Sequence, residues 1–444
     1  MAACKIDAYC DERLNILLVC KRWKDLVEET PSLWSVISRS HPWNVVKRAL
    51  VFSRQHPLVV YLPTKPKSRT VYRNQIRYEC QDLLPHCHRF RALRLTGAVS
   101  AYKPIFQQPA PRLEFLTISI LVPVTIGNAF AGHTPHLIEA HIITTYLQSE
   151  AGPLVSPLRN LRTLEIGYWK DWGYFEAVLK ASPTLKELKI SKSVDIPDLP
   201  VITTAPLLLP GVTKLSFYET WISVADFIAR RINVPNMSSF RMFGQIPSHQ
   251  ARFSTRGLIA FLGPWTQSTM PLHTFIRVTD KRVCWGPAPQ HADDGYMEFR
   301  FDHHNMNIGI AALDMIGQVM LSSHRDVRCE ATIRTRFRDW TPEVQKAVGR
   351  LPGIVSLRLW GDCDRNALWG VKEWLEYLTR AEQTYPLCDL EEVCIPLESG
   401  RGFAEYSTQT LAKRSVSSIT PHELGQSKTI RVKELVRVPC EMRL

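Results

Sequence analysis

The sequence lacks any long hydrophobic run. Its longest apolar stretch covers residues 115–127 and is interrupted by Pro123, whereas a helix that crosses a membrane needs about 20 consecutive apolar residues. The first residues mix acidic and basic side chains ahead of a short apolar run at residues 14–20, which is not typical of a secretory signal. We therefore expect a protein that is not exported and has no membrane partner.

Cysteine pairs and catalytic motifs are lacking as well. The eleven cysteines are scattered, and no two of them form a Cys-x-x-Cys pair, which indicates reduced thiols in the cytoplasm or nucleus. Neither a phosphate-binding Gly-x-x-x-x-Gly-Lys-Ser/Thr loop nor a Gly-x-Ser-x-Gly elbow occurs. No pattern in the sequence pairs Asp293, Asp294 or Asp302 with a second group for general acid–base catalysis. We expect no catalytic residues, and an enzyme with its own active site is the alternative.

A zinc motif is also missing. Residues 80–88 hold two cysteines and two histidines, but their spacing does not match a known zinc frame. His303 and His304 are adjacent, so on a strand their side chains would point to opposite faces of the sheet. We therefore expect no metal and no other cofactor.

Positive charge is in excess, although it forms no long block. Lys plus Arg number 55 and Asp plus Glu number 42, which gives a net charge of +13. A basic balance favours an acidic partner, which would be an acidic protein surface, a phosphoprotein or a nucleic acid. Because the excess is spread along the chain, we do not expect nucleic acid to be the partner.

What the sequence does contain is a globular composition over a considerable length. The chain has 444 residues, of which 45% are hydrophobic and 22% are charged, and these proportions are typical of folded proteins. The length exceeds that of an ordinary single domain. A small module joined to an array of repeats would account for it.

A motif of the form Leu-x-x-Leu-x-Ile recurs along the first half of the chain. Its fourth position falls at residues 93, 116, 140, 164, 188, 215 and 240, so the steps are 23, 24, 24, 24, 27 and 25 residues. Periods of about 20–29 residues are typical of leucine-rich repeats. A proline precedes many of the motifs, which indicates a recurrent turn before a strand. Residues 171–182 have the apolar spacing of a helix between two such strands.

These repeats predict an α/β fold with a short N-terminal helical segment followed by an irregular leucine-rich-repeat solenoid. Each unit would hold a strand, a loop and a helix that cannot bury its apolar face alone, so the units would stack. A generic α/β domain with coincidental leucines is the alternative. After residue 246 the period breaks. Further strands are predicted at residues 294–302, 330–337, 354–359 and 390–395, and a helix is predicted to start at Pro342.

Residues 14–34 carry two amphipathic helical patterns. Apolar residues recur at helical spacing in "LNILLVCKRWKDLVEE", and Pro31 is expected to end this helix near Glu29. Thr30 would then cap a second short helix that starts at Pro31. Two such helices cannot bury a core of their own. They either cap the main domain or dock onto another protein.

The stretch "LLVCKRWKDLVEETPSLWSVI" resembles the second half of an F-box, in which a Val-Cys-x-x-Trp segment is followed by Leu-Trp. The matching positions are Leu17, Leu18, Val19, Cys20, Trp23, Leu26, Leu33 and Trp34. The following "HPWNVVKRALVFSRQHPLVVYL" is similar to the segment after the box in mushroom-type fungal members of the family. The opening Leu-Pro-x-Glu pattern of an F-box is not found in residues 1–12, which leaves open a degenerate box or a start further upstream.

This resemblance implies the substrate-recognition subunit of a Skp–cullin–F-box ubiquitin ligase, a receptor that is not itself an enzyme. The eight matching residues would bind the Skp-type adaptor and through it a cullin, while the repeat surface would hold a protein target. The alternative is a leucine-rich-repeat interaction scaffold that works independently of a ligase and has a degenerate F-box.

Two groups of residues are candidates for holding the target. Aromatic residues that directly follow strand motifs would lie on the rim of the repeats, and they are Tyr168, Trp169, Trp172, Tyr218 and Trp221. Arginine alternates in "IRTRFR", so Arg334, Arg336 and Arg338 would share one face of a strand. Such a row could bind an acidic or phosphorylated segment, because guanidinium binds phosphate bidentately. The alternative for the aromatic residues is packing within loops. The alternative for the arginine row is a solvated strand face.

The predicted domain organisation follows from these patterns. It consists of partial F-box helices at residues 1–40, a connecting segment at 41–84, regular leucine-rich repeats at 85–246, irregular repeats with inserts at 247–400, and a basic C-terminal tail at 401–444.

Overall fold

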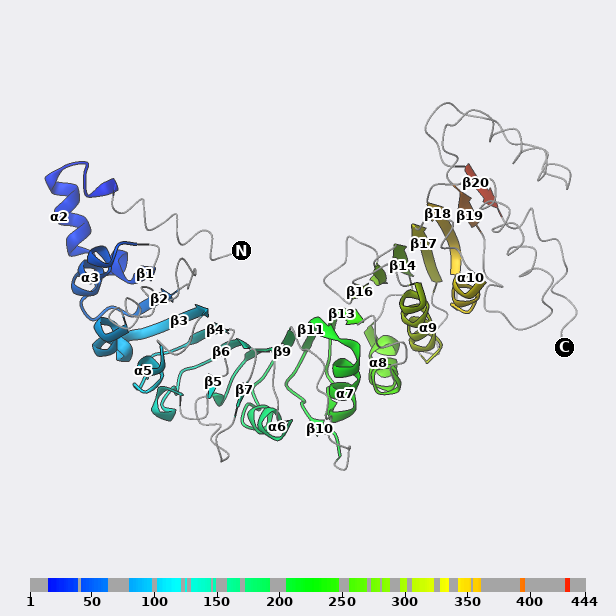
Figure 1. The fold of residues 1–444 in the computed structure, drawn as a ribbon, viewed down its shortest axis with the longest axis horizontal. Helices are drawn as coiled ribbons and strands as arrows, with labels where there is room; N and C mark the ends of the chain where they lie inside the picture. Colours follow the sequence, from blue (N-terminus) through cyan, green and yellow to red (C-terminus); the bar gives the residue numbers. More distant parts are fainter. Residues whose placement is uncertain are drawn as a thin grey trace, which may run out of the picture. The chain divides into compact units, whose positions relative to one another are not determined.

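The computed structural model (Figure 1) describes residues 15–38, 41–62, 80–97, 102–120, 124–125, 129–144, 147–148, 158–167, 172–191, 205–246, 255–269, 273–279, 282–287, 296–301, 306–322, 328–334, 342–352, 354–360, 392–395 and 428–431. The chain forms two compact units. Unit 1 comprises Met1–Asp198, Leu207–Ser216 and Ile232–Asn236, and unit 2 comprises Leu199–Pro206, Phe217–Arg231 and Met237–Leu444.

Unit 1 begins with short helices and continues as a series of strands. In chain order its elements are α2 (Lys21–Glu29), η1 (Pro31–Trp34), β1 (Val36–Ser38), α3 (Trp43–Phe52), β2 (Leu58–Leu62), η2 (Leu84–Arg89), β3 (Phe90–Gly97), α5 (Lys103–Phe106), β4 (Phe115–Ile120), β5 (Val124–Thr125), η4 (Ala129–Gly132), β6 (Glu139–Thr144), β7 (Leu147–Gln148), β8 (Thr163–Ile166), α6 (Trp172–Lys180), β9 (Glu187–Ser191), β10 (Leu207–Leu208) and β12 (Ile232–Asn233). A further strand, β11 (Lys214–Trp221), starts in unit 1 and ends in unit 2.

The main sheet of unit 1 is parallel, and its strand order is β1-β2-β3-β4-β6-β8-β9. The fourth positions of the recurrent motif pair directly across it, and these residues are Leu93, Leu116, Ala140, Leu164 and Leu188. All of them are buried. Because side chains alternate between the two faces of a strand, paired residues line one face, and here that face is the apolar core. The strands predicted at these motifs are confirmed.

A proline turn precedes four of the strand motifs. In each turn the backbone N–H of the first apolar residue donates to the carbonyl three residues earlier, and the pairs are Leu113 to Ala110, Leu137 to Thr134, Leu185 to Ser182 and Val212 to Leu209. The second residue of each turn is a proline, whose fixed φ suits this position of a β-turn. The recurrent turn predicted from the sequence is therefore confirmed.

Unit 2 alternates strands with longer helices. Apart from the end of β11, its elements are α7 (Ile222–Arg231), β13 (Ser239–Ile246), α8 (Arg256–Thr269), β14 (His273–Thr279), β15 (Arg282–Pro287), β16 (Tyr296–Phe301), α9 (Met306–Ser322), β17 (Arg328–Arg334), α10 (Pro342–Gly349), β18 (Ile354–Trp360), β19 (Glu392–Ile395) and β20 (Lys428–Arg431). The predicted strands after residue 246 are present as β16, β17, β18 and β19, and the predicted helix starts at Pro342.

The sheet of unit 2 does not follow chain order. Its strands lie in the order β13-β16-β15-β14-β17-β18-β19-β20, with β15 antiparallel to both of its neighbours and β19 antiparallel to β20. The remaining pairs are parallel. Helices α8, α9 and α10 lie side by side (Figure 1), and α9 packs on β15 and β16.

The predicted architecture, a short N-terminal helical segment followed by an irregular leucine-rich-repeat solenoid, is wrong. The described residues form an α/β fold built on large, mostly parallel sheet structure, and its first strand already lies within residues 1–40. The connections differ from strand to strand, since α5 has four residues and α6 has nine. The spacing of apolar residues indicated where strands form, but pairing between distant strands decided their order.

The N-terminal helices also differ in detail from the prediction. Cys20 has an extended backbone (φ −163°, ψ 168°), so a turn at residues 17–19 separates the first helical residues from α2. Helix α2 ends at Glu29 as predicted, but the second helix, η1, is a 3₁₀-helix of four residues. The Thr30 hydroxyl does not cap it and instead donates to the Leu26 carbonyl at 2.7 Å.

Candidate interaction surfaces

Large apolar side chains are exposed at the N-terminus of unit 1. The exposed fractions are 84% for Leu18, 65% for Val19, 49% for Trp23, 54% for Leu26 and 37% for Leu33. We call these five residues the N-terminal apolar patch. Trp23 and Leu26 are three residues apart on α2, so they lie on neighbouring positions of the same helix face. Exposed apolar residues that gather in this way are typical of an interaction site.

Helix α2, which carries Trp23 and Leu26, packs against the core of unit 1. Val27, on α2, is buried, and its carbonyl accepts a hydrogen bond of 2.7 Å from the Trp34 indole N–H. The Trp34 ring packs against Phe52 of α3 at 5.0 Å between ring centroids. Arg48 of α3 also forms an ion pair of 3.1 Å with Glu28. These contacts tie α2 to α3, so Trp23 and Leu26 of the patch are presented on an anchored helix.

The eight residues predicted to bind an adaptor therefore comprise six exposed residues, one half-buried residue and one buried residue. Five form the N-terminal apolar patch, Cys20 is exposed beside them, and Leu17 is half-buried. Trp34 is only 2% exposed. The prediction of direct adaptor contact by Trp34 is corrected, because its indole is occupied by Val27 and Phe52 within the chain.

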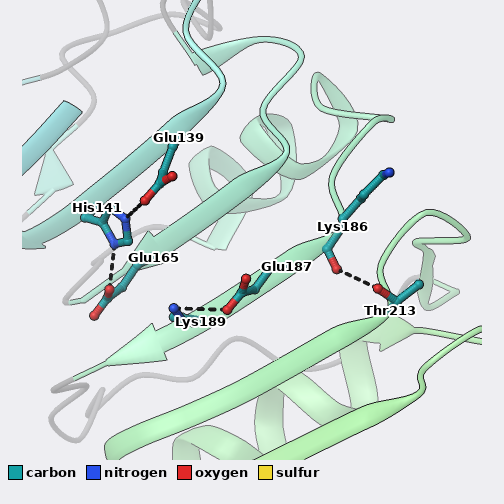
Figure 2. A network of polar contacts seen from close by, with 7 residues as sticks. All are labelled: Glu139, His141, Glu165, Lys186, Glu187, Lys189 and Thr213. Atoms are coloured by element: carbon teal, nitrogen blue, oxygen red, sulfur yellow. Dashed lines mark hydrogen bonds and ion pairs between the residues drawn. The ribbon is translucent and has the colours of Figure 1, made fainter. Parts of the chain in front are cut away.

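A second feature is a row of polar residues on the sheet of unit 1. Arg94, Thr117, His141, Glu165 and Lys189 occupy directly paired positions on five adjacent strands, and the last three of them are drawn in Figure 2. They alternate with buried apolar residues along each strand, so they lie on the face opposite the core.

His141 bridges two carboxylates in this row. Its Nδ1 lies 2.7 Å from a carboxylate oxygen of Glu165, and its Nε2 contacts a carboxylate oxygen of Glu139 (Figure 2). An ionised carboxylate only accepts hydrogen bonds, so both ring nitrogens must carry a proton to satisfy this geometry. The hydrogen bond that His141 donates to Glu165 raises the pKa of His141, and the contact with Glu139 raises it further. Together these two contacts outweigh desolvation, which by itself would lower that pKa. The imidazolium form is thus favoured.

The neighbouring carboxylates are held in the same way. Burial by itself would raise the pKa of Glu165, but the hydrogen bond and charge of His141 lower it overall. On the next strand, Lys189 forms an ion pair of 3.0 Å with Glu187 (Figure 2). Positively and negatively charged side chains thus alternate with one another on this face of the sheet. The sequence carried a signal for it, since His141 and Glu165 occupy the same position of successive motifs.

The aromatic residues predicted to bind a target have different surroundings. Tyr168 and Trp169 lie outside the described residues. Trp172, in unit 1, is buried, and its indole N–H donates to the Glu176 carboxylate at 2.9 Å. Its predicted place on a binding rim is therefore corrected to a place in the core.

Tyr218 and Trp221 belong to unit 2. Tyr218 is 46% exposed, and its ring meets that of Phe243 edge to face at 5.4 Å between centroids. Trp221 is half-buried. Of the predicted arginine row, Arg334 is the last residue of β17, whereas Arg336 and Arg338 lie outside the described residues.

The cysteine- and histidine-rich stretch at residues 80–88 has no metal-binding arrangement. Burial raises the pKa of the Cys87 thiol to about 12, and the thiol lies 3.8 Å from the Leu83 carbonyl. The His86 ring is 3.2 Å from the Arg89 guanidinium. In the part of the chain that the structure describes, no three acidic, histidine or cysteine side chains gather as metal ligands would. His303 and His304 fall outside that part.

Two further findings bear on the class of protein. Among the described residues, none of the helices combines the length and the apolar character needed to cross a membrane. No protein-family model matches the chain, and no curated protein matches it.

Proposed function

We propose that this chain is the substrate-recognition subunit of a Skp–cullin–F-box ubiquitin ligase, acting in the cytoplasm or nucleus. The N-terminal apolar patch would dock the Skp-type adaptor and through it a cullin, and the sheet surfaces would hold a protein target. The observation that carries the proposal is the exposure of Leu18, Val19, Trp23, Leu26 and Leu33 at F-box-like positions.

The physical chemistry of the patch supports docking. A half-exposed tryptophan and its leucine neighbour lose unfavourable contact with water when a partner covers them. Tryptophan is also enriched among the few residues that dominate binding energy at interfaces. In this scheme the chain performs no bond chemistry. It raises the effective concentration of the target near the ubiquitin-carrying enzyme.

Co-purification of the chain with a Skp-type adaptor tests the proposal. We expect Trp23→Ala and Leu26→Ala each to weaken the complex by about 30-fold or more, the loss typical of an interface hot spot. Leu321→Ala is the matched control, because Leu321 is 56% exposed on α9 in unit 2. Binding that resists both patch substitutions would contradict the proposed contact.

A ligase-independent interaction scaffold is the second candidate. It is favoured by the same exposed apolar side chains, because such a patch can dock a partner other than a Skp-type adaptor. Comparing this chain with a version that carries any upstream F-box helix separates the two. If neither version retains the adaptor, the scaffold is the better description. If the extended version alone retains it, adaptor docking stands and the upstream helix is part of the site.

A further inference from the structure

Helix α2 has an inward side and an outward side. Two of its residues mark the inward side, because the Val27 carbonyl accepts the hydrogen bond from Trp34 and Glu28 forms the ion pair with Arg48 of α3. Successive residues of an α-helix are rotated by about 100° about its axis. The residues of α2 that point away from α3 can therefore be identified from their spacing.

The outward side carries Arg22, Leu26 and Glu29, which we call the outward stripe. These residues follow one another at spacings of four and three positions, so they share one side of the helix. All of them are exposed, and Trp23, which is also exposed, lies beside Leu26 on the same helix. The stripe thus has a positive N-terminal end, an apolar centre and a negative C-terminal end.

The two charged residues of the stripe are too far apart to pair with each other. Arg22 and Glu29 are separated by about 10 Å along the helix axis, whereas side chains on one helix pair when they are three or four residues apart. A partner that complements the stripe therefore presents an acidic group, an apolar surface and a basic group in that order.

A second α2 helix in antiparallel orientation presents these groups in that order. With a two-fold axis near Leu26, Arg22 of one copy lies opposite Glu29 of the other copy, and symmetry forms the same pair a second time. The apolar side chains of both copies then meet in the centre. A parallel arrangement would instead place like charges side by side.

We propose that a second copy of this chain binds the outward stripe, so that two α2 helices pair in antiparallel orientation. The interface is small, so the dimer is weak and reversible. Its consequence for the adaptor rests on the proposed function, because Trp23 and Leu26 would be covered in both complexes. Self-pairing would then close the adaptor site of the free chain, and the adaptor would compete with the second copy.

Sedimentation equilibrium of the full chain tests the pairing, at loading concentrations of about 1–200 μM, which suit a weak interface. We expect the average mass to rise from that of a monomer toward that of a dimer as the concentration increases. A parent chain that stays monomeric over the whole range would overturn the proposal.

A charge swap tests the antiparallel geometry. Arg22→Glu and Glu29→Arg each place like charges opposite one another twice, so each should weaken self-association about tenfold or more at low ionic strength. In an equimolar mixture of the two variants both opposite-charge pairs form again, and association should return to within about threefold of the parent value. A mixture that associates as weakly as the single variants would overturn the antiparallel pairing.

Lys21→Glu is the matched control for Arg22→Glu. It makes the same charge change at the neighbouring exposed position, which lies off the outward stripe, and it should change self-association less than twofold. An effect as large as that of Arg22→Glu would contradict the stripe. Thermal midpoints of all variants should equal that of the parent chain, because the substituted side chains are exposed.

Adding a Skp-type adaptor in excess tests the competition and separates the two proposals. We expect the dimer to convert into a complex of one chain with one adaptor. A dimer that persists with adaptor bound would overturn the closure of the site. A chain that forms the dimer but does not bind the adaptor would refute the proposed function and leave the self-pairing standing. A monomer that binds the adaptor would support the proposed function and overturn the self-pairing.

Discussion

At the scale of single residues, His141 is the clearest polar feature of unit 1. Its two ring nitrogens face carboxylates from β6 and β8, at Glu139 and Glu165. A residue at which both nitrogens must donate is sensitive to the loss of one proton. The bridge across the two strands therefore depends on pH.

We expect His141→Gln to destabilise the chain at mildly acidic pH and to have a smaller effect at alkaline pH. The folded pKa of His141 is raised, so its stabilisation is complete below the unfolded value of about 6.5 and is lost as pH rises through the folded pKa. The pKa of Glu165 is lowered, so its stabilisation is lost as pH falls through its own folded pKa. The free energy of unfolding of the parent chain therefore exceeds that of His141→Gln most between the folded pKa of Glu165 and the folded pKa of His141. We expect this difference to be about 1–3 kcal/mol.

Urea unfolding of both proteins at pH 6 and pH 9 measures this difference. His136→Gln is the matched control, because His136 is exposed in the same unit. A free-energy difference between the parent chain and His141→Gln that is identical at the two pH values would refute the imidazolium bridge.

At the scale of elements, helix α8 takes its N-terminal cap from a neighbouring helix. The Asp226 side chain on α7 is buried, and one of its carboxylate oxygens accepts a hydrogen bond of 2.9 Å from the Leu258 N–H in the first turn of α8. Its other oxygen is paired with Arg230. One carboxylate thus satisfies a helix end and a cation at once.

Asp226→Ala should reduce the free energy of unfolding by about 2–5 kcal/mol, because it removes both the cap of α8 and the buried carboxylate's ion pair with Arg230. Asp314→Ala is the control, since Asp314 is 34% exposed and 3.6 Å from Arg350, and an exposed ion pair contributes about 0–1 kcal/mol. Chemical denaturation monitored by circular dichroism compares them. Equal losses for the two variants would contradict the capping role.

At the scale of the whole molecule, the N-terminal apolar patch lies in unit 1 and the Asp226 cap lies in unit 2. We expect Trp23→Ala to leave the free energy of unfolding within about 0.5 kcal/mol of the parent value, because an exposed side chain contributes little to folding. Asp226→Ala should in turn retain the adaptor under conditions in which the chain is folded.

Adaptor titration and chemical denaturation of the same protein preparations measure this independence. A loss of stability for Trp23→Ala as large as that for Asp226→Ala would indicate that the patch is part of the folded core.

The amino-acid sequence by itself determined which segments form strands, turns and several helices. Local patterns were sufficient, because the apolar alternation around Leu93, Leu164 and Leu188 specifies a strand with one buried face. Proline at the second position of a turn likewise acts through its own φ angle. Pro342 started a helix for the same local reason.

Only the tertiary structure decided which of these segments became neighbours. The order β13-β16-β15-β14-β17 depends on pairing between strands far apart in the chain, so periodicity predicted a solenoid that does not form. The burial of Trp34 and the exposure of Trp23 depend on the packing of α2 on α3. His141 meets Glu165 because strand register brings them together. These contacts are long-range, and a one-residue shift in register would move each side chain to the other face.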